Sequence, residues 1–472
     1  MDDYFLKFED RLPEPPLPYS PLREMLWQFL ATIALVVGGW YIWWRWAHSL
    51  NPDAMWFALP LVLAETCAYF GMLLFVFNLW KDDPLKIESP PAVLSDVVDG
   101  HPEGDRPISV DVMFATYDED PELVRLGILD AKQMTYPHPI DIRIHILDDG
   151  RRPEMRAVTE AEGVNYITRS TNEGFKAGNL RNAMEQTSGD FMVICDADTR
   201  PFPTFLEHTM GYFRDKKMAW VQTPQWFYDL PAGEHLTDKL QRRFGQFGGK
   251  IGRAVERTVG PVVYGADPFV NDPKMFYDII LRRRNWVNAA FCCGAGSIHR
   301  REAVMEAALR SFGDKVEQRS FAVEENITVS SKEREIAPDL MAAIRTESAA
   351  TEVLTPYRFH VSEDIYTSIV LHSDSERGWK SKQHPMVESK MLSPQDLLTW
   401  TVQRFKYAGG SLDILKNDNP LFRRGLSIGQ RLMYGTTFYS YLAPLWNIIF
   451  LFAPVVYLFT GASPVSAYSN EF

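Results

Sequence analysis

Hydrophobic residues form three long runs, two near the start of the chain and one near its end. Residues 26–44 are almost free of polar side chains, residues 55–80 form a second run that contains Glu65, and residues 441–460 form the third. Each run is long enough to cross a bilayer core of about 30 Å. The pattern predicts three transmembrane helices, with buried helices of a soluble protein as the alternative. An acid at mid-membrane depth is costly, so Glu65 is expected to have a functional role or a structural partner.

The residues that flank these runs predict their orientation. Tryptophans mark the ends of the first two runs, as interfacial aromatic residues do: Trp40, Trp43, Trp44, Trp46, Trp56 and Trp80. The loop 47–54 contains no Lys or Arg, whereas Lys81, Lys86, Arg423, Arg424 and Arg431 lie on the other side of the runs. Cytoplasmic loops are enriched in Lys and Arg, so residues 81–430 are expected in the cytoplasm.

Between the runs, the pattern changes to that of a soluble α/β protein. Three apolar stretches each end in acids: "ISVDVMFATYDED" at 108–120, "IDIRIHILDDG" at 140–150 and "DFMVICDADTR" at 190–200. Helical stretches separate them, and strands that alternate with helices indicate a parallel sheet. A lone acid after a strand is usually a cap or a turn residue. Three such endings predict a shared site at the carboxyl edge of the sheet, where ligands bind in such folds.

Charge and cysteine usage exclude some classes of protein. The chain of 472 residues has 49 basic and 61 acidic residues and a formal charge of −12, which is not typical of a nucleic-acid-binding protein. Four cysteines, two of them adjacent, form no disulfide framework and suit a reducing compartment.

Short sequence motifs indicate which kind of ligand the predicted site binds. No G-x-G-x-x-G follows the predicted strands, and "FGGKIG" at 247–252 lacks the first glycine and the Ser/Thr of a phosphate loop. The paired carboxylates of "DAD", Asp196 and Asp198, instead suit a hard divalent cation such as Mg²⁺, completed by ligand phosphates. Lys176 in "FKAGN" would supply a second positive charge for a diphosphate.

Eight motifs in order carry a family resemblance: "ATYDED", "LDDG", "KAGNL", "CDAD", "VQTPQWFYD", "NAAFCCGAG", "SED" and "QRFKY". Together they resemble the processive family 2 glycosyltransferases of the cellulose synthase type, which includes synthases of cellulose, curdlan and mixed-linkage β-glucan. The match covers most of residues 26–460. The resemblance implies an α/β GT-A fold, Rossmann-like with a mostly parallel sheet. It also implies inverting transfer of glucose from UDP-glucose to a growing β-glucan that enters a membrane channel.

Roles for single residues follow from the resemblance alone. It places the donor nucleotide at Thr116, Glu119, Asp148 and Lys176, and the diphosphate with Mg²⁺ or Mn²⁺ at Asp196 and Asp198. It makes Asp364 the general base, for which the alternatives are a helix N-cap and a surface acid. The expected acceptor-binding residues are Cys293, Gln403, Lys406 and Tyr407. Ser362, Lys406 and Tyr407 stand where the family more often has Thr, Arg and Trp, and the last two bear on linkage and acceptor geometry.

The expected organisation has five parts: an N-terminal cytoplasmic segment (1–25), two transmembrane helices (26–80), a linker (81–107), a cytoplasmic GT-A domain with interface helices (108–430), and a transmembrane helix with a short tail (431–472). The charged segment 311–359 is interpreted as an insertion. The expected partners are UDP-glucose, the glucan chain, membrane lipid and further subunits that complete the channel, in an inner membrane. Two alternatives are a non-processive transferase that acts on a lipid or short acceptor and a catalytically silent regulatory subunit.

Overall fold

The computed structural model describes residues 4–231, 233–264, 273–331, 338–351, 354–358, 360 and 362–466. The chain divides into two compact units. The first comprises Met1–Pro13, Lys86–Asp229 and Phe291–Gln395, and the second comprises Glu14–Leu85, Leu230–Ala290 and Asp396–Phe472.

The first unit is built on a seven-stranded sheet with the order β11-β6-β10-β4-β1-β2-β3. Its strands are β1 (Ile108–Thr116), β2 (Ile140–Asp148), β3 (Asn165–Ile167), β4 (Phe191–Asp196), β6 (Met218–Gln222), β10 (Ser297–Arg300) and β11 (Lys380–Gln383). Strands β4, β1, β2 and β3 pair in parallel, whereas β10 runs antiparallel between β4 and β6. The predicted α/β architecture with a mostly parallel sheet is confirmed.

Strand register brings the predicted acids to one edge of this sheet. Thr116 pairs with Asp148 across β1 and β2, and Ala115 pairs with Asp196 across β1 and β4. Parallel strands that end in register place their last side chains together. The "ATYDED", "LDDG" and "CDAD" motifs therefore begin at the same edge.

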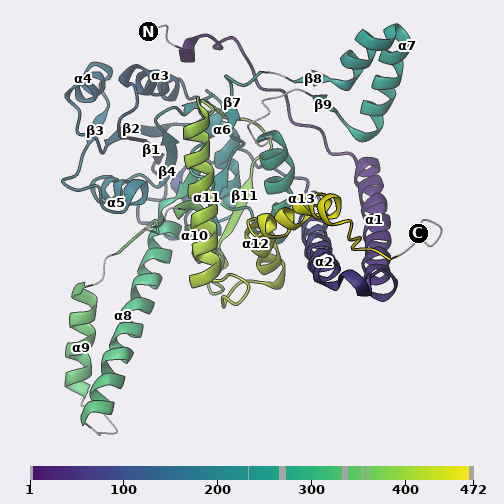
Figure 1. Cartoon of the computed structure of the whole chain (residues 1–472). Helices are drawn as coiled ribbons and strands as arrows, with labels where there is room; N and C mark the ends of the chain where they lie inside the picture. The colour runs from purple at the N-terminus through teal and green to yellow at the C-terminus, as the bar shows by residue number, and fades with distance from the viewer. Residues whose placement is uncertain are drawn as a thin grey trace. The chain divides into compact units, whose positions relative to one another are not determined.

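Helices cover both faces of the parallel strands (Figure 1). The helices of this unit are α3 (Pro121–Lys132), α4 (Pro153–Glu162), α5 (Phe175–Gln186), α6 (Phe205–Thr209), α8 (Arg301–Ser331), α9 (Pro338–Thr351) and α10 (Glu363–His372). On one face, α3 approaches so closely that a Cβ at Gly127 would lie 2.8 Å from the Phe114 ring. On the other face, Leu180 of α5 shares a buried cluster with Met113. Successive strand residues point to opposite faces, so α3 and α5 enclose β1.

The charged segment 311–359 is largely helical. Its described part forms the end of α8 and all of α9, two helices that lie against each other and extend away from the sheet (Figure 1). Its interpretation as an insertion stays a prediction.

A small second sheet lies beside the DAD motif. It has the order β5-β12-β7, formed by β5 (Arg200–Pro201), β12 (Ser389–Met391) and β7 (Trp226–Phe227). The Phe202 amide donates to the Glu388 carbonyl at 2.8 Å. This sheet therefore joins the chain after "CDAD" to the segment that follows β11.

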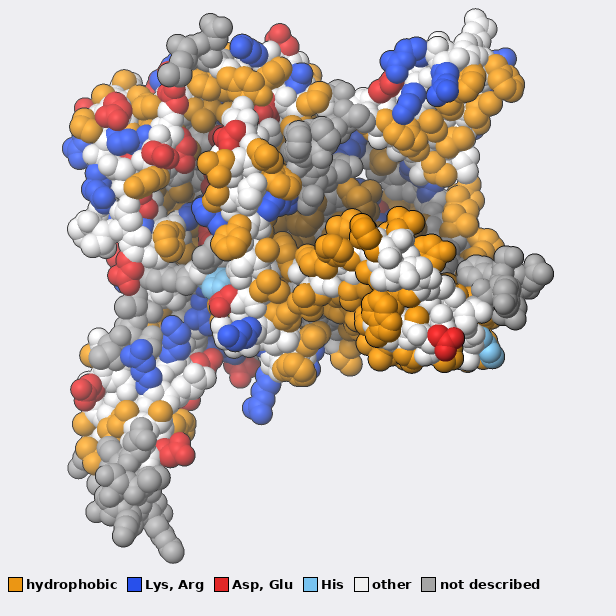
Figure 2. All heavy atoms as spheres, viewed as in Figure 1, with side chains coloured by type: hydrophobic (Ala, Val, Ile, Leu, Met, Phe, Trp, Pro, Cys, Tyr) orange, Lys and Arg blue, Asp and Glu red, His pale blue; other side chains and the backbone are white. Residues whose placement is uncertain are grey.

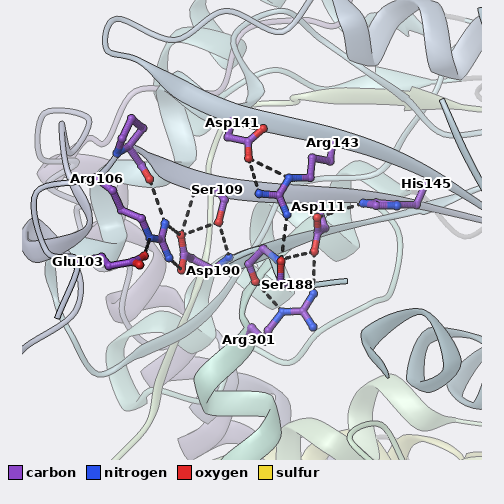
Figure 3. Close-up of polar contacts among 12 residues, drawn as sticks. Glu103, Arg106, Ser109, Asp111, Asp141, Arg143, His145, Ser188, Asp190 and Arg301 are labelled. Atoms are coloured by element: carbon purple, nitrogen blue, oxygen red, sulfur yellow. Dashed lines mark hydrogen bonds and ion pairs between the residues drawn. The ribbon is translucent and has the colours of Figure 1, made fainter. Parts of the chain in front are cut away.

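Buried ion pairs hold the amino ends of the central strands (Figure 3). The carboxylate of Asp111 on β1 is fully buried and lies 3.0 Å from His145 Nε2 on β2. It also accepts from Arg301 of α8 and from the Gly189 amide, both at 2.7 Å. One carboxylate thus ties β1, β2, the start of β4 and α8 together at the edge opposite the acid motifs.

The second unit is mainly helical. Its helices are α1 (Pro21–His48), α2 (Met55–Asn78), α7 (Leu236–Val259), η5 (Met275–Leu281), η6 (Arg282–Val287), α11 (Leu397–Asn417), α12 (Ile428–Ser440) and α13 (Ala443–Thr460). Helix α2 packs against α1, α12 and α13. Among the described residues, the segments Pro21–His48, Pro52–Asn78 and Ala443–Thr460 are long and apolar enough to cross a membrane. The three predicted apolar helices are thus confirmed.

Glu65 has a structural partner. Arg45 Nε lies 2.6 Å from its carboxylate, and the Tyr41 hydroxyl donates to it at 3.2 Å. The ion pair joins α1 to α2 and accounts for an acid in an apolar helix.

Helix α7 separates apolar from basic side chains. Phe244, Phe247, Ile251, Val255 and Val259 are exposed, and the helix also carries Lys239, Arg242, Arg243, Lys250, Arg253 and Arg257. Figure 2 shows hydrophobic side chains along one side of this helix and basic ones along the other. The backbone leaves helical geometry at Phe244 and Gly245, so α7 consists of two helical pieces joined at a kink. Basic amphipathic segments of this kind are typical of a membrane interface.

We expect Asp111→Ala to destabilise the full-length protein by about 3 kcal/mol, because it removes a fully buried acid and leaves the partly buried Arg301 without its carboxylate partner. Asp141→Ala is the matched control: this aspartate pairs with Arg143 in the neighbouring part of the network but is half exposed, and its loss should cost less than about 1 kcal/mol. Thermal unfolding of both variants in detergent measures the difference. Equal shifts would contradict a special role for Asp111.

Candidate active site

The predicted nucleotide-binding residues meet at the ends of β1 and β2. The Thr116 hydroxyl donates to Glu119 Oε2 at 2.8 Å, and the Tyr117 amide donates to the same oxygen at 2.8 Å. Arg152 donates to Thr116 Oγ1 at 2.8 Å and to the Glu119 carbonyl at 2.5 Å. The structure therefore brings Thr116, Glu119 and Asp148 together through an arginine that sequence reasoning missed. Its signal was its place two residues after "LDDG".

The Asp148 carboxylate is fully engaged by protein donors. It is buried and accepts from the amides of Gly150 and Arg152 at 3.0 and 2.7 Å, from Arg152 Nε at 3.3 Å and from the Tyr166 hydroxyl at 2.9 Å. These bonds fix the turn after β2. Asp148 thus shapes the pocket, and its direct contact with a nucleotide stays a prediction.

The second acid of "LDDG" positions the loop before α5. Asp149 makes two hydrogen bonds with Arg169, each 2.7 Å long. The same guanidinium donates to the carbonyls of Glu173 and Phe175 at 2.5 and 2.8 Å. A bidentate pair of this kind is geometrically rigid. Asp149 and Arg169 therefore hold the start of the helix that carries Lys176.

Lys176 neutralises the first acid of the DAD motif. Its Nζ lies 2.5 Å from Asp196 Oδ1, so the ends of α5 and β4 are joined by an ion pair. Burial alone would lower the pKa of this lysine, but the carboxylates of Asp196, Asp364 and Glu363 outweigh it and raise the pKa above its ordinary value. Lys176 therefore carries a fixed positive charge at the site.

Of the two acids in the DAD motif, Asp196 has the nearby positive charge of Lys176, and Asp198 has no such partner in the described part of the chain. Burial, together with the negative charge of Asp196, raises its pKa from 3.8 to about 7, and the Leu392 amide donates to it at 3.1 Å. The charge of Glu119 raises this pKa further. Two neighbouring carboxylates fit a divalent cation with oxygen ligands, because the cation would neutralise the negative charge of both. Asp196 and Asp198 are thus the residues that could hold a metal ion here.

Asp364 faces the same place from the start of α10. A Cβ built at Gly294 would lie 2.9 Å from Asp364 Oδ2 and 3.3 Å from Lys176 Nζ, so both side chains flank this glycine. Gly294 has a φ of +84°, which favours glycine. The N-cap alternative for Asp364 is wrong, because Ser362 occupies the N-cap position and Asp364 lies in the first turn.

The environment of Asp364 suits a proton acceptor. Burial raises its pKa, and the positive charge of Lys176 opposes part of this increase. Burial and the charge of Asp364 also raise the pKa of Glu363, a neighbour that sequence reasoning did not select although it stands in the "SED" motif. A carboxyl with a pKa raised toward neutrality is a candidate general base.

Cys293 lies where two motifs join. Its amide donates to Gln222 Oε1 at 2.8 Å, and its carbonyl accepts from Gln225 Nε2 at 3.0 Å. The "VQTPQW" and "FCCGAG" segments are thereby linked next to Gly294. This places the Cys293 backbone in the site, and acceptor binding by its side chain stays a prediction.

The three other predicted acceptor residues belong to the second unit. Gln403, Lys406 and Tyr407 lie on α11, where spacings of three and four residues put them on one side of the helix. Arg404 lies 5.9 Å from the centre of the Tyr407 ring, which is 43% exposed. Their role toward an acceptor stays a prediction.

Comparisons with known sequences show which proteins the chain resembles. Residues 111–307 match the family described as Glycosyl transferase family 2. The chain is 30% identical to cellulose synthase 1 of Komagataeibacter xylinus over 93% of its length, and 28% identical to the UDP-forming cellulose synthase catalytic subunit of Pseudomonas fluorescens over 92%. It spans 23% of the length of the first relative and 48% of the second, thus less than half of either.

A solved structure supports the fold. The chain superposes on a mannosyltransferase from Pyrobaculum calidifontis, solved with GDP-Man and Mn²⁺, with a TM-score of 0.52, 11% identity and coverage of 86% of this chain and 88% of that one. At this identity the likeness shows the fold alone. Together with the sheet and the family match, it confirms the predicted GT-A fold.

The raised pKa of Asp198 predicts a pH dependence. Without a cation, the folded chain keeps this carboxyl protonated up to about pH 7, whereas an unfolded chain ionises it near pH 4. The contribution of the Asp198 carboxyl to the free energy of unfolding is therefore fully present below about pH 4 and is lost as the pH rises through 7. A cation that binds the ionised pair reverses this loss.

We expect Mn²⁺ to bind about tenfold more tightly at pH 8 than at pH 6, because Asp198 must lose its proton. Electron paramagnetic resonance of free Mn²⁺ measures this affinity in the detergent-solubilised protein. Asp198→Asn should weaken binding and flatten the pH dependence between these values. A wild-type affinity that does not change with pH would contradict the assigned charge state.

Proposed function

We propose that this chain, a family 2 glycosyltransferase of the cellulose synthase type, polymerises glucose from UDP-glucose into a β-glucan and feeds it into a membrane channel. The observation that carries the proposal is that Lys176 and Asp364 both flank Gly294, while Lys176 pairs with Asp196 of the DAD motif. These groups supply a cation for a leaving diphosphate and a base for an attacking hydroxyl. The named relatives make cellulose synthase the most direct precedent.

The donor would occupy the carboxyl edge of the central sheet. Thr116, Glu119 and Arg152 present hydroxyl, carboxylate and guanidinium groups at the ends of β1 and β2, and these suit the polar edges of a uridine. Lys176 would turn from Asp196 toward the diphosphate when the donor binds. The positive charge of Lys176 would then stabilise the departing UDP, an electrostatic effect that is usually large.

Asp196 and Asp198 would bind Mg²⁺ or Mn²⁺. Bound there, the ion would neutralise the negative charge that develops on the diphosphate. The carboxylate oxygens of this chain suit either ion.

Asp364 would act as the general base of the reaction. Its carboxylate would take the proton of the acceptor hydroxyl while the hydroxyl oxygen forms a bond to the anomeric carbon. The bond from that carbon to the UDP oxygen would break, and the sugar would invert. The first turn of α10 fixes the carboxylate, and Gly294 leaves room for a close approach of the substrate because it has no side chain.

Gln403, Lys406 and Tyr407 would bind the acceptor end of the glucan. Tyr407 offers an exposed ring for stacking on a sugar face, and Lys406 offers a point charge to a phosphate, without the bidentate geometry of an arginine. Because Lys406 and Tyr407 differ from the Arg and Trp that are usual in the family, the proposed product includes β-1,3 and mixed-linkage glucan as well as β-1,4-linked glucan. Processive synthesis is preferred over single transfer because the motif lies between membrane-like helices.

The apolar helices support an integral membrane location. Helix α13 buries none of its side chains, and residues such as Leu458 and Phe459 are 79% and 87% exposed. So large an apolar surface needs lipid or protein around it. Hydrophobic side chains gather along this helix in Figure 2. We place α1, α2 and α13 in the inner membrane and the catalytic unit in the cytoplasm, with further subunits completing the channel.

The proposal is tested by UDP release from membranes that contain the full chain, supplied with UDP-glucose and Mg²⁺ or Mn²⁺, with linkage analysis of the insoluble product. Release together with a polymer supports a synthase, and the linkage identifies the glucan. Release with only a short or lipid-linked product would favour the non-processive transferase. Nucleotide binding without release would favour a silent subunit.

We expect Asp364→Asn to reduce UDP release by a factor of about 10² to 10⁴, because the general base is lost. UDP binding should stay within about twofold of the wild type, since the substitution keeps the shape of the side chain. Glu376→Gln, on the exposed turn after the same helix, is the control and should retain activity. Equal release by wild type and Asp364→Asn would exclude this base.

The acceptor assignment predicts that Tyr407→Ala lowers polymer synthesis about tenfold, because a stacking contact of about 1.4 kcal/mol is lost. Combined Lys406→Arg and Tyr407→Trp should retain synthesis and shift the linkage or the rate. Radiolabelled product and methylation analysis measure both. If all three proteins make the same product at the same rate, α11 does not bind the acceptor.

A further inference from the structure

Two histidines and a glutamate, none of which is assigned to catalysis, meet in the first unit. His208 comes from α6, and His384 and Glu388 come from the segment between β11 and β12. Their ligand atoms all lie within 4.8 Å of one another, and no other group of three or more His, Cys, Asp or Glu in the described part of the chain is so placed. His208 Nδ1 lies 2.6 Å from Glu388 Oε1, and His384 Nε2 lies 3.7 Å from the same oxygen.

His384 is buried with one ring nitrogen unsatisfied. The side chain is fully buried, and Nδ1 lies 3.1 Å from the Tyr212 hydroxyl. The other nitrogen, Nε2, is buried without a hydrogen-bond partner, since 3.7 Å to Glu388 is too long for a hydrogen bond. A buried polar atom without a partner is costly and rare. A cation between Nε2 and the carboxylate would satisfy both.

The surrounding groups resemble the outer shell of a metal site. The Tyr212 hydroxyl engages the far nitrogen of His384, and Thr204 Oγ1 donates to Glu388 Oε2 at 2.7 Å. Groups of this kind fix the tautomer and the orientation of metal ligands. Here they direct His384 Nε2 and Glu388 Oε1 toward His208.

We propose that His208, His384 and Glu388 bind a divalent transition metal ion of the zinc class. Two imidazoles and one carboxylate form a known ligand set for Zn²⁺, which takes water in its fourth position. A tetrahedral ion with ligand bonds of about 2.1 Å separates its ligand atoms by about 3.4 Å. The observed separations of 2.6 to 4.8 Å bracket this value. His208 is 34% exposed, which gives the ion access to solvent.

The ion would influence the active site by fixing the position of β12. Glu388 directly precedes β12, its carbonyl accepts from Phe202 at 2.8 Å, and the Leu392 amide just after β12 donates to Asp198. A metal bound by α6 and this segment would therefore fasten the strand that contacts the DAD motif. The binding itself does not depend on the function proposed above.

The test measures zinc bound to the full chain in detergent, after removal of metals by a chelator and reloading with ZnCl₂, by mass spectrometry of the metal. We expect about one zinc per chain and at least tenfold weaker binding for His208→Ala and for Glu388→Gln, which preserves side-chain volume. His235→Ala is the control, because His235 is equally exposed at 35% and bonds through Nδ1 to Glu256 at 3.3 Å. It should bind zinc like the wild type.

A second arm separates this site from the catalytic one. The double variant Asp196→Asn with Asp198→Asn should keep the zinc, and Co²⁺ in place of Zn²⁺ should give the intense visible absorption of a four-coordinate ion in the wild type. Absence of zinc from the loaded wild type would overturn the proposal and leave an ordinary His208–Glu388 hydrogen bond. Unchanged binding by both His208→Ala and Glu388→Gln, or loss only in the Asp196/Asp198 variant, would overturn it as well.

Discussion

The parallel, in-register pairing of β1 with β2 and β4 is the constraint on which the site depends. Because Thr116 pairs with Asp148 and Ala115 pairs with Asp196, the acids that follow three strands collect at one edge of the sheet. Carboxylates crowded in this way repel one another. The structure offsets the repulsion with cations from three different segments, namely Arg152, Arg169 and Lys176. Arg152 and Arg169 also donate to backbone carbonyls of the neighbouring loops.

The buried carboxylates at the two edges of the sheet differ in how fully their charge is compensated. At the amino edge, Asp111 is buried and its carboxylate is saturated by His145, Arg301 and a backbone amide, which is a structural arrangement. At the carboxyl edge, Asp198 and Asp364 have raised pKa values because burial and neighbouring acids leave their charge only partly compensated. Such incomplete compensation costs stability and is typical of sites that bind a cation or transfer a proton.

Glycosyl transfer fits this electrostatic arrangement. With Lys176 beside Asp196 and Asp364 on the other side of Gly294, the site separates the group that would stabilise a leaving diphosphate from the group that would accept a proton. A metal ion held by the two histidines and the glutamate before β12 would link α6 to the strand that contacts Asp198.

In the second unit, the Arg45–Glu65 ion pair shows how a pair of apolar helices accommodates an acid that has a structural partner.

The sequence by itself determined the α/β class, the mostly parallel sheet and the three apolar helices, because periodicity and long apolar runs are local properties of the chain. It also located the acids of the site, since strand ends in parallel sheets share an edge. Only the tertiary structure decided which groups complete the site. Arg152 and Arg169 act through contacts with segments up to 36 and 20 residues away. Asp364 meets Lys176 only across Gly294, and His208 meets His384, which lies 176 positions further along the chain. Local sequence patterns do not predict such long-range contacts, because these contacts arise from the packing of the whole sheet and its helices.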